Sequence, residues 1–209
     1  MSDCVIHTHW AGPMGNMQYV IQSGAEALIV DPAWDIPELQ AIVTQQGLTV
    51  VGILLTHEHY DHVSGVPECL ALNNVPVYIS EYAHYDPPVP MVLNQLAVGA
   101  TIPFSGHSIA VLHTPGHSPG GVCYRLGKQL ITGDTVFVDG CGRADLPHSD
   151  VEQLYMSLFE TLWPLPDDTV IYPGHDYGPT PTDTWGNQKK TNRFLQSETR
   201  EVFLRKRKG

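Results

Sequence analysis

The stretch ILLTHEHYDHVSG, residues 53–65, places three histidines and an aspartate directly after an apolar run. The polar cluster comprises His57, His59, Asp61 and His62. Imidazole and carboxylate side chains are poor core formers, and this spacing fits neither one face of a helix nor one face of a strand. We interpret the stretch as a strand end that turns into a helix, with side chains that diverge toward two neighbouring metal ions.

Three other segments share this layout, in which an apolar strand is followed by a tight turn and a metal-capable side chain. AVLHTPG precedes His117, QLITG precedes Asp134, and TVIYPG precedes His175. Strand ends can meet on one rim of a sheet, where such scaffolds carry their chemistry. Seven nitrogen and oxygen ligands are too many for one tetrahedral ion, so the set favours two ions with a shared carboxylate.

The composition fits a globular metalloprotein. The chain has 209 residues, 42% of them hydrophobic, and no Pro/Gly-rich linker divides it, so we expect one domain over residues 1–209. The formal net charge of −11 would repel a phosphate backbone, which argues against a nucleic-acid partner. The 11 histidines equal the Lys and Arg total, which is unusual and points to metal binding.

The sequence also predicts a cytoplasmic protein without a membrane partner. No apolar run approaches the roughly 18 residues of a membrane-spanning helix. The N-terminus lacks a basic start followed by an apolar segment, so no secretory signal is expected. Cys4, Cys69, Cys123 and Cys141 lack CxxC spacing and are expected to be free thiols in a reducing compartment.

Periodicity and turn residues predict an α/β layered sandwich with helices on both sides. Strands are expected at 17–24, 27–32, 50–56, 75–80, 108–114, 121–127, 128–133 and 168–174, and helices at 36–47, 66–74, 149–163 and 187–209. For the helix at 149–163 we expect Ser149 as the N-cap, with Glu152 completing a capping box. His113 is assigned a structural role, whereas His84 and His148 are weaker candidates for lining a pocket.

The motifs THEHYDH (56–62), HTPGHSPGG (113–121), TGDTVF (132–137) and YPGHDYG (172–178) resemble, in the expected order, those of the metallo-β-lactamase superfamily. The resemblance covers roughly residues 15–195 and implies a four-layered αββα sandwich, with two mixed sheets flanked by helices. It also implies two divalent metal ions, with zinc expected in preference to iron or manganese. By the family pattern His57, His59 and His117 would hold the first ion, Asp61, His62 and His175 the second, and Asp134 would bridge them.

Within that superfamily the chain most resembles the glyoxalase II group, without the C-terminal helical domain of its long members. That resemblance implies a hydrolase in which a metal-bridging hydroxide attacks the carbonyl of a small-molecule thioester or related acyl substrate. Asp61 would orient the hydroxide, and Tyr177 would contact the thiol carrier, as its counterpart contacts glutathione. We further expect Arg143 to grip a substrate carboxylate and Asp176 to orient an imidazole of the site.

Three alternatives stay open. GCGRAD (140–145) resembles the GCGRTD of persulfide dioxygenases, which share the fold, use one iron and act on glutathione persulfide. A lactone or ester hydrolase would use the same ligands. A metal-stabilised binding protein without turnover is the non-catalytic alternative.

Overall fold

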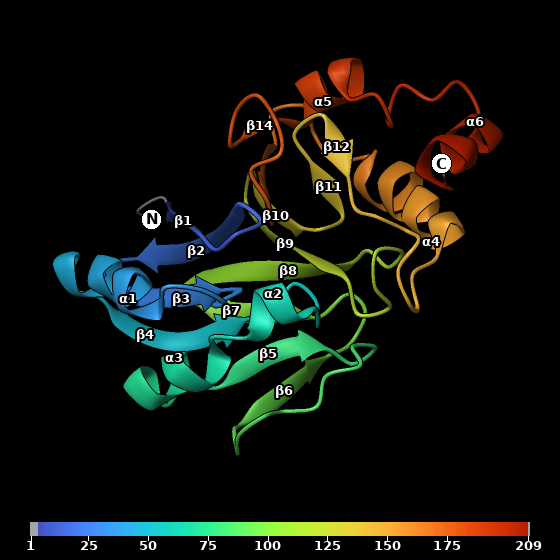
Figure 1. The fold of residues 1–209 in the computed structure, drawn as a ribbon. Helices are drawn as coiled ribbons and strands as arrows, with labels where there is room; N and C mark the ends of the chain where they lie inside the picture. Colours follow the sequence, from blue (N-terminus) through green and yellow to red (C-terminus); the bar gives the residue numbers. More distant parts are fainter. Residues whose placement is uncertain (1–3, 209) are drawn as a thin grey trace.

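Two six-stranded sheets form the centre of the computed structural model, which describes residues 4–208 (Figure 1). The first sheet contains, in spatial order, β1 (Val5–Ala11), β2 (Asn16–Ser23), β3 (Glu26–Val30), β4 (Thr49–Leu54), β5 (Val77–Ser80) and β6 (Leu93–Leu96). The second contains β14 (Asp183–Thr184), β13 (Val170–Pro173), β10 (Gln129–Gly133), β9 (Val122–Leu126), β8 (His107–His113) and β7 (Thr101–Phe104). A small hairpin pairs β11 (Val136–Phe137) with β12 (Gly140–Cys141).

Both sheets are mixed. In the first, β1, β2 and β3 pair antiparallel, whereas β3 to β6 pair parallel. In the second, β7 to β10 pair antiparallel, and β10 pairs parallel with β13. As a result β8, β10 and β13 run in the same direction and end at one edge of the second sheet.

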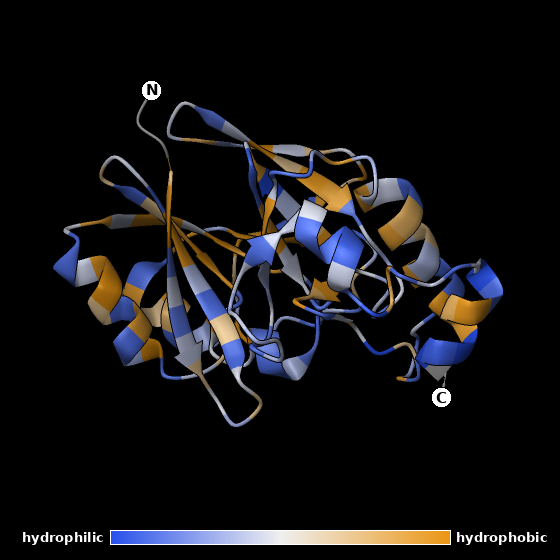
Figure 2. Ribbon diagram, turned by 90° about the horizontal axis from the view of Figure 1, so that it is seen from above, coloured by the Kyte–Doolittle hydropathy of each residue, from blue (hydrophilic) through white to orange (hydrophobic). Residues whose placement is uncertain are grey.

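Alternation of side chains along the strands explains the layers. In β2, Tyr19 and Ile21 belong to an apolar cluster between the sheets, whereas Val20 points to the outer face of the first sheet. In β9, Tyr124 faces the inner cluster, and Cys123 packs on the outer face of the second sheet. The central strands of each sheet thus bury both faces, and Figure 2 shows them as mostly hydrophobic.

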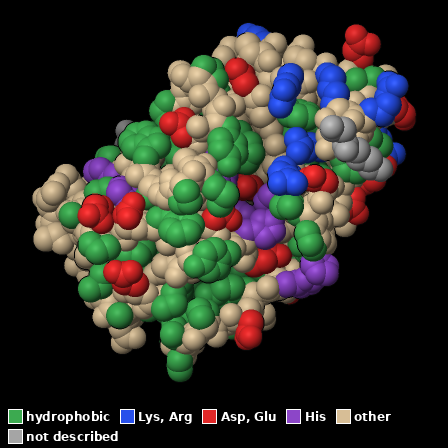
Figure 3. Space-filling model, in the orientation of Figure 1, with side chains coloured by type: hydrophobic (Ala, Val, Ile, Leu, Met, Phe, Trp, Pro, Cys, Tyr) green, Lys and Arg blue, Asp and Glu red, His purple; other side chains and the backbone are tan. Residues whose placement is uncertain are grey.

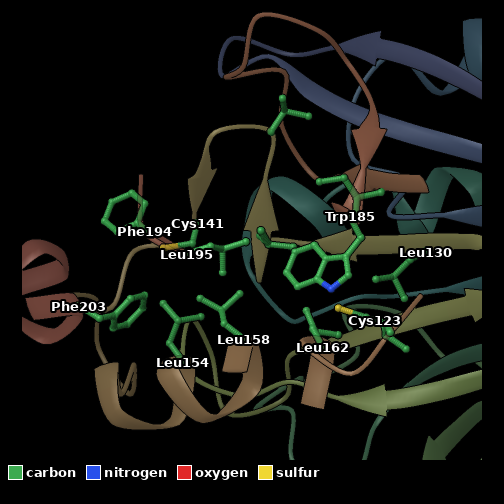
Figure 4. Close-up of a cluster of buried hydrophobic side chains, with 14 of the residues drawn as sticks. Cys123, Leu130, Cys141, Leu154, Leu158, Leu162, Trp185, Phe194, Leu195 and Phe203 are labelled. Carbon is green, nitrogen blue, oxygen red and sulfur yellow. The ribbon is translucent and has the colours of Figure 1, made fainter. Parts of the chain in front are cut away.

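Helices form the two outer layers, which confirms the expected four-layered αββα sandwich. α1 (Ile36–Gln45) and α3 (Val66–Asn73) cover the first sheet, and the short α2 (Tyr60–Val63) lies between β4 and α3 along the chain. The second sheet is covered by α4 (Val151–Met156), the π-helix η1 (Ser157–Leu162) and α5 (Trp185–Thr191), and α6 (Arg200–Lys208) packs against α4. Figure 4 shows Trp185 from α5 in one apolar cluster with Leu158 and Leu162 of η1 and Leu130 of β10.

The predicted helix at 149–163 is present, but its expected cap is wrong. Asp150 is the N-cap, and its Oδ1 accepts hydrogen bonds from the backbone nitrogens of Glu152 (2.8 Å) and Gln153 (3.2 Å). Ser149 instead donates its hydroxyl hydrogen to the carbonyl of Leu146 (2.7 Å). Both residues are good caps, and the chain turns one residue later than the sequence pattern suggests.

The single helix predicted at 187–209 is also wrong, because it is divided into α5 and α6. The side chain of Asn192 donates to the carbonyls of Gly140 (2.9 Å) and Phe137 (3.3 Å), so the chain leaves α5 to meet the β11–β12 hairpin. Gly209 lies outside the described residues. Six strands were not predicted, namely β1, β6, β7, β11, β12 and β14. Within residues 4–208 no helix combines the length and the apolar character needed to cross a membrane.

Candidate metal centre

Four strand ends supply the candidate ligands, and the rim that they form belongs to both sheets rather than to one. His57 and His59 follow β4 of the first sheet, and Asp61 and His62 lie in the adjoining α2. The other three follow strands of the second sheet, with His117 after β8, Asp134 after β10 and His175 after β13. The structure brings all seven side chains together.

The first group contains His57, His59 and His117, whose ligand nitrogens all lie within 4.8 Å of one another. His117 Nε2 is 2.9 Å from His59 Nδ1. The Nε2 atom of His57 is buried without a hydrogen-bond partner among the described residues. Burial, together with the proximity of His62, lowers the pKa of His57 well below its usual value. A neutral imidazole whose ring nitrogen has no hydrogen-bond partner is the form that ligates metal.

The second group contains Asp61, His62 and His175, again with ligand atoms within 4.8 Å of one another. The Nε2 atoms of His62 and His175 are 3.3 Å apart, and Asp61 Oδ2 lies 3.4 Å from His175 Nε2. Burial would raise the pKa of Asp61, but the hydrogen bond from His175 and the nearby His62 and Asn16 lower it to about 2. Asp61 is therefore a carboxylate at neutral pH.

Asp134 lies between the two groups. Its Oδ2 is 3.4 Å from His117 Nε2 in the first group and 3.3 Å from His175 Nε2 in the second. Burial would raise the pKa of Asp134, but His62 and His175 hold it well below its usual range. Its Oδ1 lies 3.3 Å from His62 Nε2, but the two atoms are not aligned for a hydrogen bond, and Oδ1 has no other hydrogen-bond partner among the described residues.

These observations fit bound cations. Two nitrogens about 2.0–2.1 Å from one tetrahedral zinc ion would be roughly 3.4 Å apart, close to the separation of His62 Nε2 and His175 Nε2. Buried polar atoms are normally hydrogen-bonded, so the unpartnered His57 Nε2 and Asp134 Oδ1 need an explanation that an ion would supply. The close packing of Gly174 serves the same centre, since a Cβ there would lie 2.4 Å from Asp134 Oδ1.

Partners on the far side of each ring fix the orientation of four imidazoles. The contacts to the Nδ1 atoms are Asp31 Oδ2 for His62 (2.9 Å), Thr56 Oγ1 for His57 (3.1 Å), the Arg143 carbonyl for His117 (2.9 Å) and the Met14 carbonyl for His175 (3.1 Å). The role expected for Asp176 is therefore filled by others, and its side chain is exposed.

Asp31 is the residue that sequence reasoning missed. It is buried, and its carboxylate accepts hydrogen bonds from the Thr56 backbone nitrogen (2.7 Å) and the Thr56 hydroxyl (2.6 Å), besides contacting His62. A signal was present, because ALIVDP ends an apolar strand in an aspartate, as the other four segments end in ligands. Its three contacts account for both carboxylate oxygens, which assigns Asp31 to support of the centre.

The two expected substrate-binding residues both adjoin the centre. The Tyr177 ring stacks on His175, with centroids 4.7 Å apart, and remains 59% exposed. The exposed Arg143 side chain forms a two-point ion pair with Asp145 (2.9 and 3.0 Å), so it is engaged within its own loop.

The remaining histidines lie outside the seven-residue cluster. His113 Nε2 contacts the Pro119 carbonyl (3.0 Å), and its ring stacks on Tyr82, which agrees with a structural role. The rings of His84 and His148 face each other with centroids 5.0 Å apart. His84 lines a separate cavity of about 640 Å³.

Comparison with known proteins agrees with this geometry. The family model described as the metallo-beta-lactamase superfamily matches residues 11–175. The chain is 33% identical to the "probable polyketide biosynthesis zinc-dependent hydrolase BaeB" of Bacillus velezensis, over 95% of this chain and 88% of that protein. It is 35% identical to the hydroxyacylglutathione hydrolase of Tolumonas auensis, over 92% of this chain and 70% of that enzyme. The crystal structure of ETHE1 from Myxococcus xanthus superposes with a TM-score of 0.86 at 26% identity, over 98% and 90% of the two chains.

Proposed function

We propose that this chain, which belongs to the metallo-beta-lactamase superfamily and is a metal-dependent hydrolase of that group, cleaves thioesters with two divalent metal ions. Zinc is the expected metal, in preference to iron or manganese. The observation that carries the proposal is the position of Asp134, whose Oδ2 lies 3.3–3.4 Å from a histidine of each group. A single carboxylate between two three-residue groups is an arrangement that suits two neighbouring ions.

The proposed ligands follow from the two groups. His57, His59 and His117 would hold one ion, Asp61, His62 and His175 the other, and Asp134 both. When bound, such ions polarise a carbonyl and lower the pKa of water. Zinc is supported by the name of the Bacillus velezensis relative, a zinc-dependent hydrolase.

The protein's own groups have distinct tasks in this proposal. Asp61 is the catalytic carboxylate. The side-chain amide of Asn16 donates a hydrogen bond to its Oδ2 (3.1 Å) and so orients the carboxylate, which can then accept a hydrogen bond from the attacking water. A thiolate leaves without prior protonation at neutral pH more readily than an alkoxide, since a free thiol titrates near ~8.5. The site accordingly needs no separate general acid.

Persulfide dioxygenation is the second candidate, favoured by the GCGRAD stretch. In the structure this stretch has a local explanation, because Arg143 pairs with Asp145 while its carbonyl accepts from His117. The contacts of Asp134 to both groups favour two ions over the single iron of that chemistry.

Elemental analysis of protein purified without added metal tests the proposal together with thioester assays. We expect close to two metal equivalents per chain and release of free thiol from S-acyl substrates, both lost in Asp134→Ala. About one equivalent of iron, with oxygen uptake on glutathione persulfide and no thioester cleavage, would overturn it. Asp176→Asn is the matched control, since that carboxylate is exposed beside a proposed ligand.

A further inference from the structure

Three arginines line one pocket beside the candidate metal centre, in a chain whose formal net charge is −11. The pocket has a volume of about 240 Å³, and Arg143, Arg193 and Arg207 come from three separate segments. Figure 3 shows Lys and Arg side chains gathered on this part of the surface, next to the histidines of the centre. Like charges brought together in an acidic protein indicate an anionic ligand.

Two of these arginines pack on the same aromatic ring and form no ion pair among the described residues. The guanidinium of Arg193 lies 4.8 Å from the centroid of the Phe194 ring, and that of Arg207 lies 5.3 Å from it. Phe194 itself is buried in the cluster shown in Figure 4. Cation–π contacts of this kind orient a guanidinium while leaving its N–H donors available.

Neither Arg193 nor Arg207 forms an ion pair within the described part of the chain, whereas Arg143 pairs with Asp145. The Nε atom of Arg207 is buried and lacks a hydrogen-bond partner among residues 4–208. The acid in the pocket wall, Asp139, accepts a hydrogen bond from the Thr191 hydroxyl (3.2 Å). Another part of the Arg207 side chain forms a hydrogen bond with the thiol of Cys141. Guanidinium groups that form no ion pair are suited to binding an oxyanion.

The pocket shares its wall with the metal centre. Phe137 and Tyr177 both line it, and both rings contact His175, with centroids 5.8 and 4.7 Å away. Arg143 also joins the two, because its side chain lines the pocket while its carbonyl accepts from His117. A ligand in the pocket would therefore extend directly toward the reacting centre.

We propose that Arg193 and Arg207 bind the phosphate of the thiol carrier, so that the substrates are thioesters of a phosphate-bearing thiol such as 4′-phosphopantetheine. This inference rests on the proposed thioesterase function and specifies its substrate class. A phosphate monoester carries up to two negative charges and three acceptor oxygens, which match two guanidinium groups outside any ion pair better than one carboxylate does. A small carrier without phosphate or carboxylate would place no anion against these arginines.

Calorimetric binding of two thiols that differ only in phosphate tests the proposal on the metal-loaded protein. 4′-Phosphopantetheine is expected to bind on the order of tenfold or more tightly than pantetheine, as a charge-assisted hydrogen bond predicts. Arg193→Gln and Arg207→Gln should each remove most of that difference, and Arg207→Lys should retain part of it. Arg205→Gln, on the same helix but outside the pocket wall, is the matched control and should retain all of it.

The possible outcomes separate the phosphate site from a carboxylate site and from the proposed thioesterase activity. Equal affinity for the two thiols, or an unchanged preference in Arg193→Gln, overturns the phosphate site. The proposal is also overturned, in favour of a carboxylate ligand, if the arginine variants bind glutathione more weakly but bind 4′-phosphopantetheine as the wild type does. If Arg207→Gln does not fold, Arg193→Gln decides, since that side chain is exposed. Arginine-dependent binding of 4′-phosphopantetheine without thioester cleavage would refute the proposed thioesterase activity and leave the phosphate site standing.

Discussion

Replacing Asp31 with Asn is expected to weaken metal binding while leaving the backbone intact. Asp31 has a positive φ of 51°, a conformation that Asn also adopts readily. The substitution keeps the shape and removes the charge. Because an amide has one acceptor oxygen, it cannot accept from the Thr56 backbone nitrogen, the Thr56 hydroxyl and His62 as the carboxylate does.

The expected magnitude follows from the contact between Asp31 Oδ2 and His62 Nδ1, which are 2.9 Å apart and buried. A hydrogen bond to a charged group contributes about 1.5–3 kcal/mol, which corresponds to roughly a tenfold to hundredfold change in affinity. Loss of an outer partner of a ligand histidine in other metal sites typically reduces metal affinity by the same ~10–100-fold. We therefore expect the second ion, held through His62, to be released more easily.

Competition with a chromophoric chelator measures this change, with metal content per chain as the second readout. Asp176→Asn, with its exposed side chain, should match the wild type. Circular dichroism establishes that the Asp31→Asn variant is folded. Equal chelator competition by the folded variant and the wild type would refute the idea that Asp31 acts through His62.

Asp134→Asn should reduce the metal content from about two equivalents toward one and lower kcat/KM by several orders of magnitude, because a neutral amide is a poor bridge between cations; full occupancy would contradict this. Gly174→Ala should lower both Tm and metal content, since its Cβ would lie 2.4 Å from Asp134 Oδ1. A normal metal content would show that Asp134 can shift without loss of metal binding. Burial raises the pKa of the thiols of Cys69 and Cys141 to about 12 and that of Cys123 to about 11, so iodoacetamide at pH 8 should modify them in urea and spare them in the native protein. Peptide mapping measures the labelling, and equal rates in both states would count against burial.

Much of the fold was predictable because strand alternation and turn residues are local signals. The stretches at 17–24, 27–32 and 50–56 are apolar enough to show as strands, and the structure has them as β2, β3 and β4. The strand β1 was missed because VIHTHWA contains two histidines and lies at the edge of its sheet, where burial does not impose an apolar pattern. The break between α5 and α6 was missed because Asn192 binds carbonyls about fifty residues away.

The candidate centre also has parts that were predictable from the sequence and parts that were not. The seven side chains of the cluster were identifiable because histidine and aspartate are unusual at strand ends. The groups that orient the rings of His117 and His175 were not, because they are the carbonyls of Arg143 and Met14. Every residue has a carbonyl, so only the tertiary structure tells which one is used.

Those two carbonyls have an evolutionary consequence. A side chain that orients a histidine cannot change without affecting the ion, but a backbone carbonyl is retained whatever amino acid carries it. The loops that contain Met14 and Arg143 can therefore exchange their side chains while His175 and His117 keep their orientation. Selection for a new substrate can thus act on the surroundings of the centre without disturbing the candidate ligands, which makes this scaffold readily diversified.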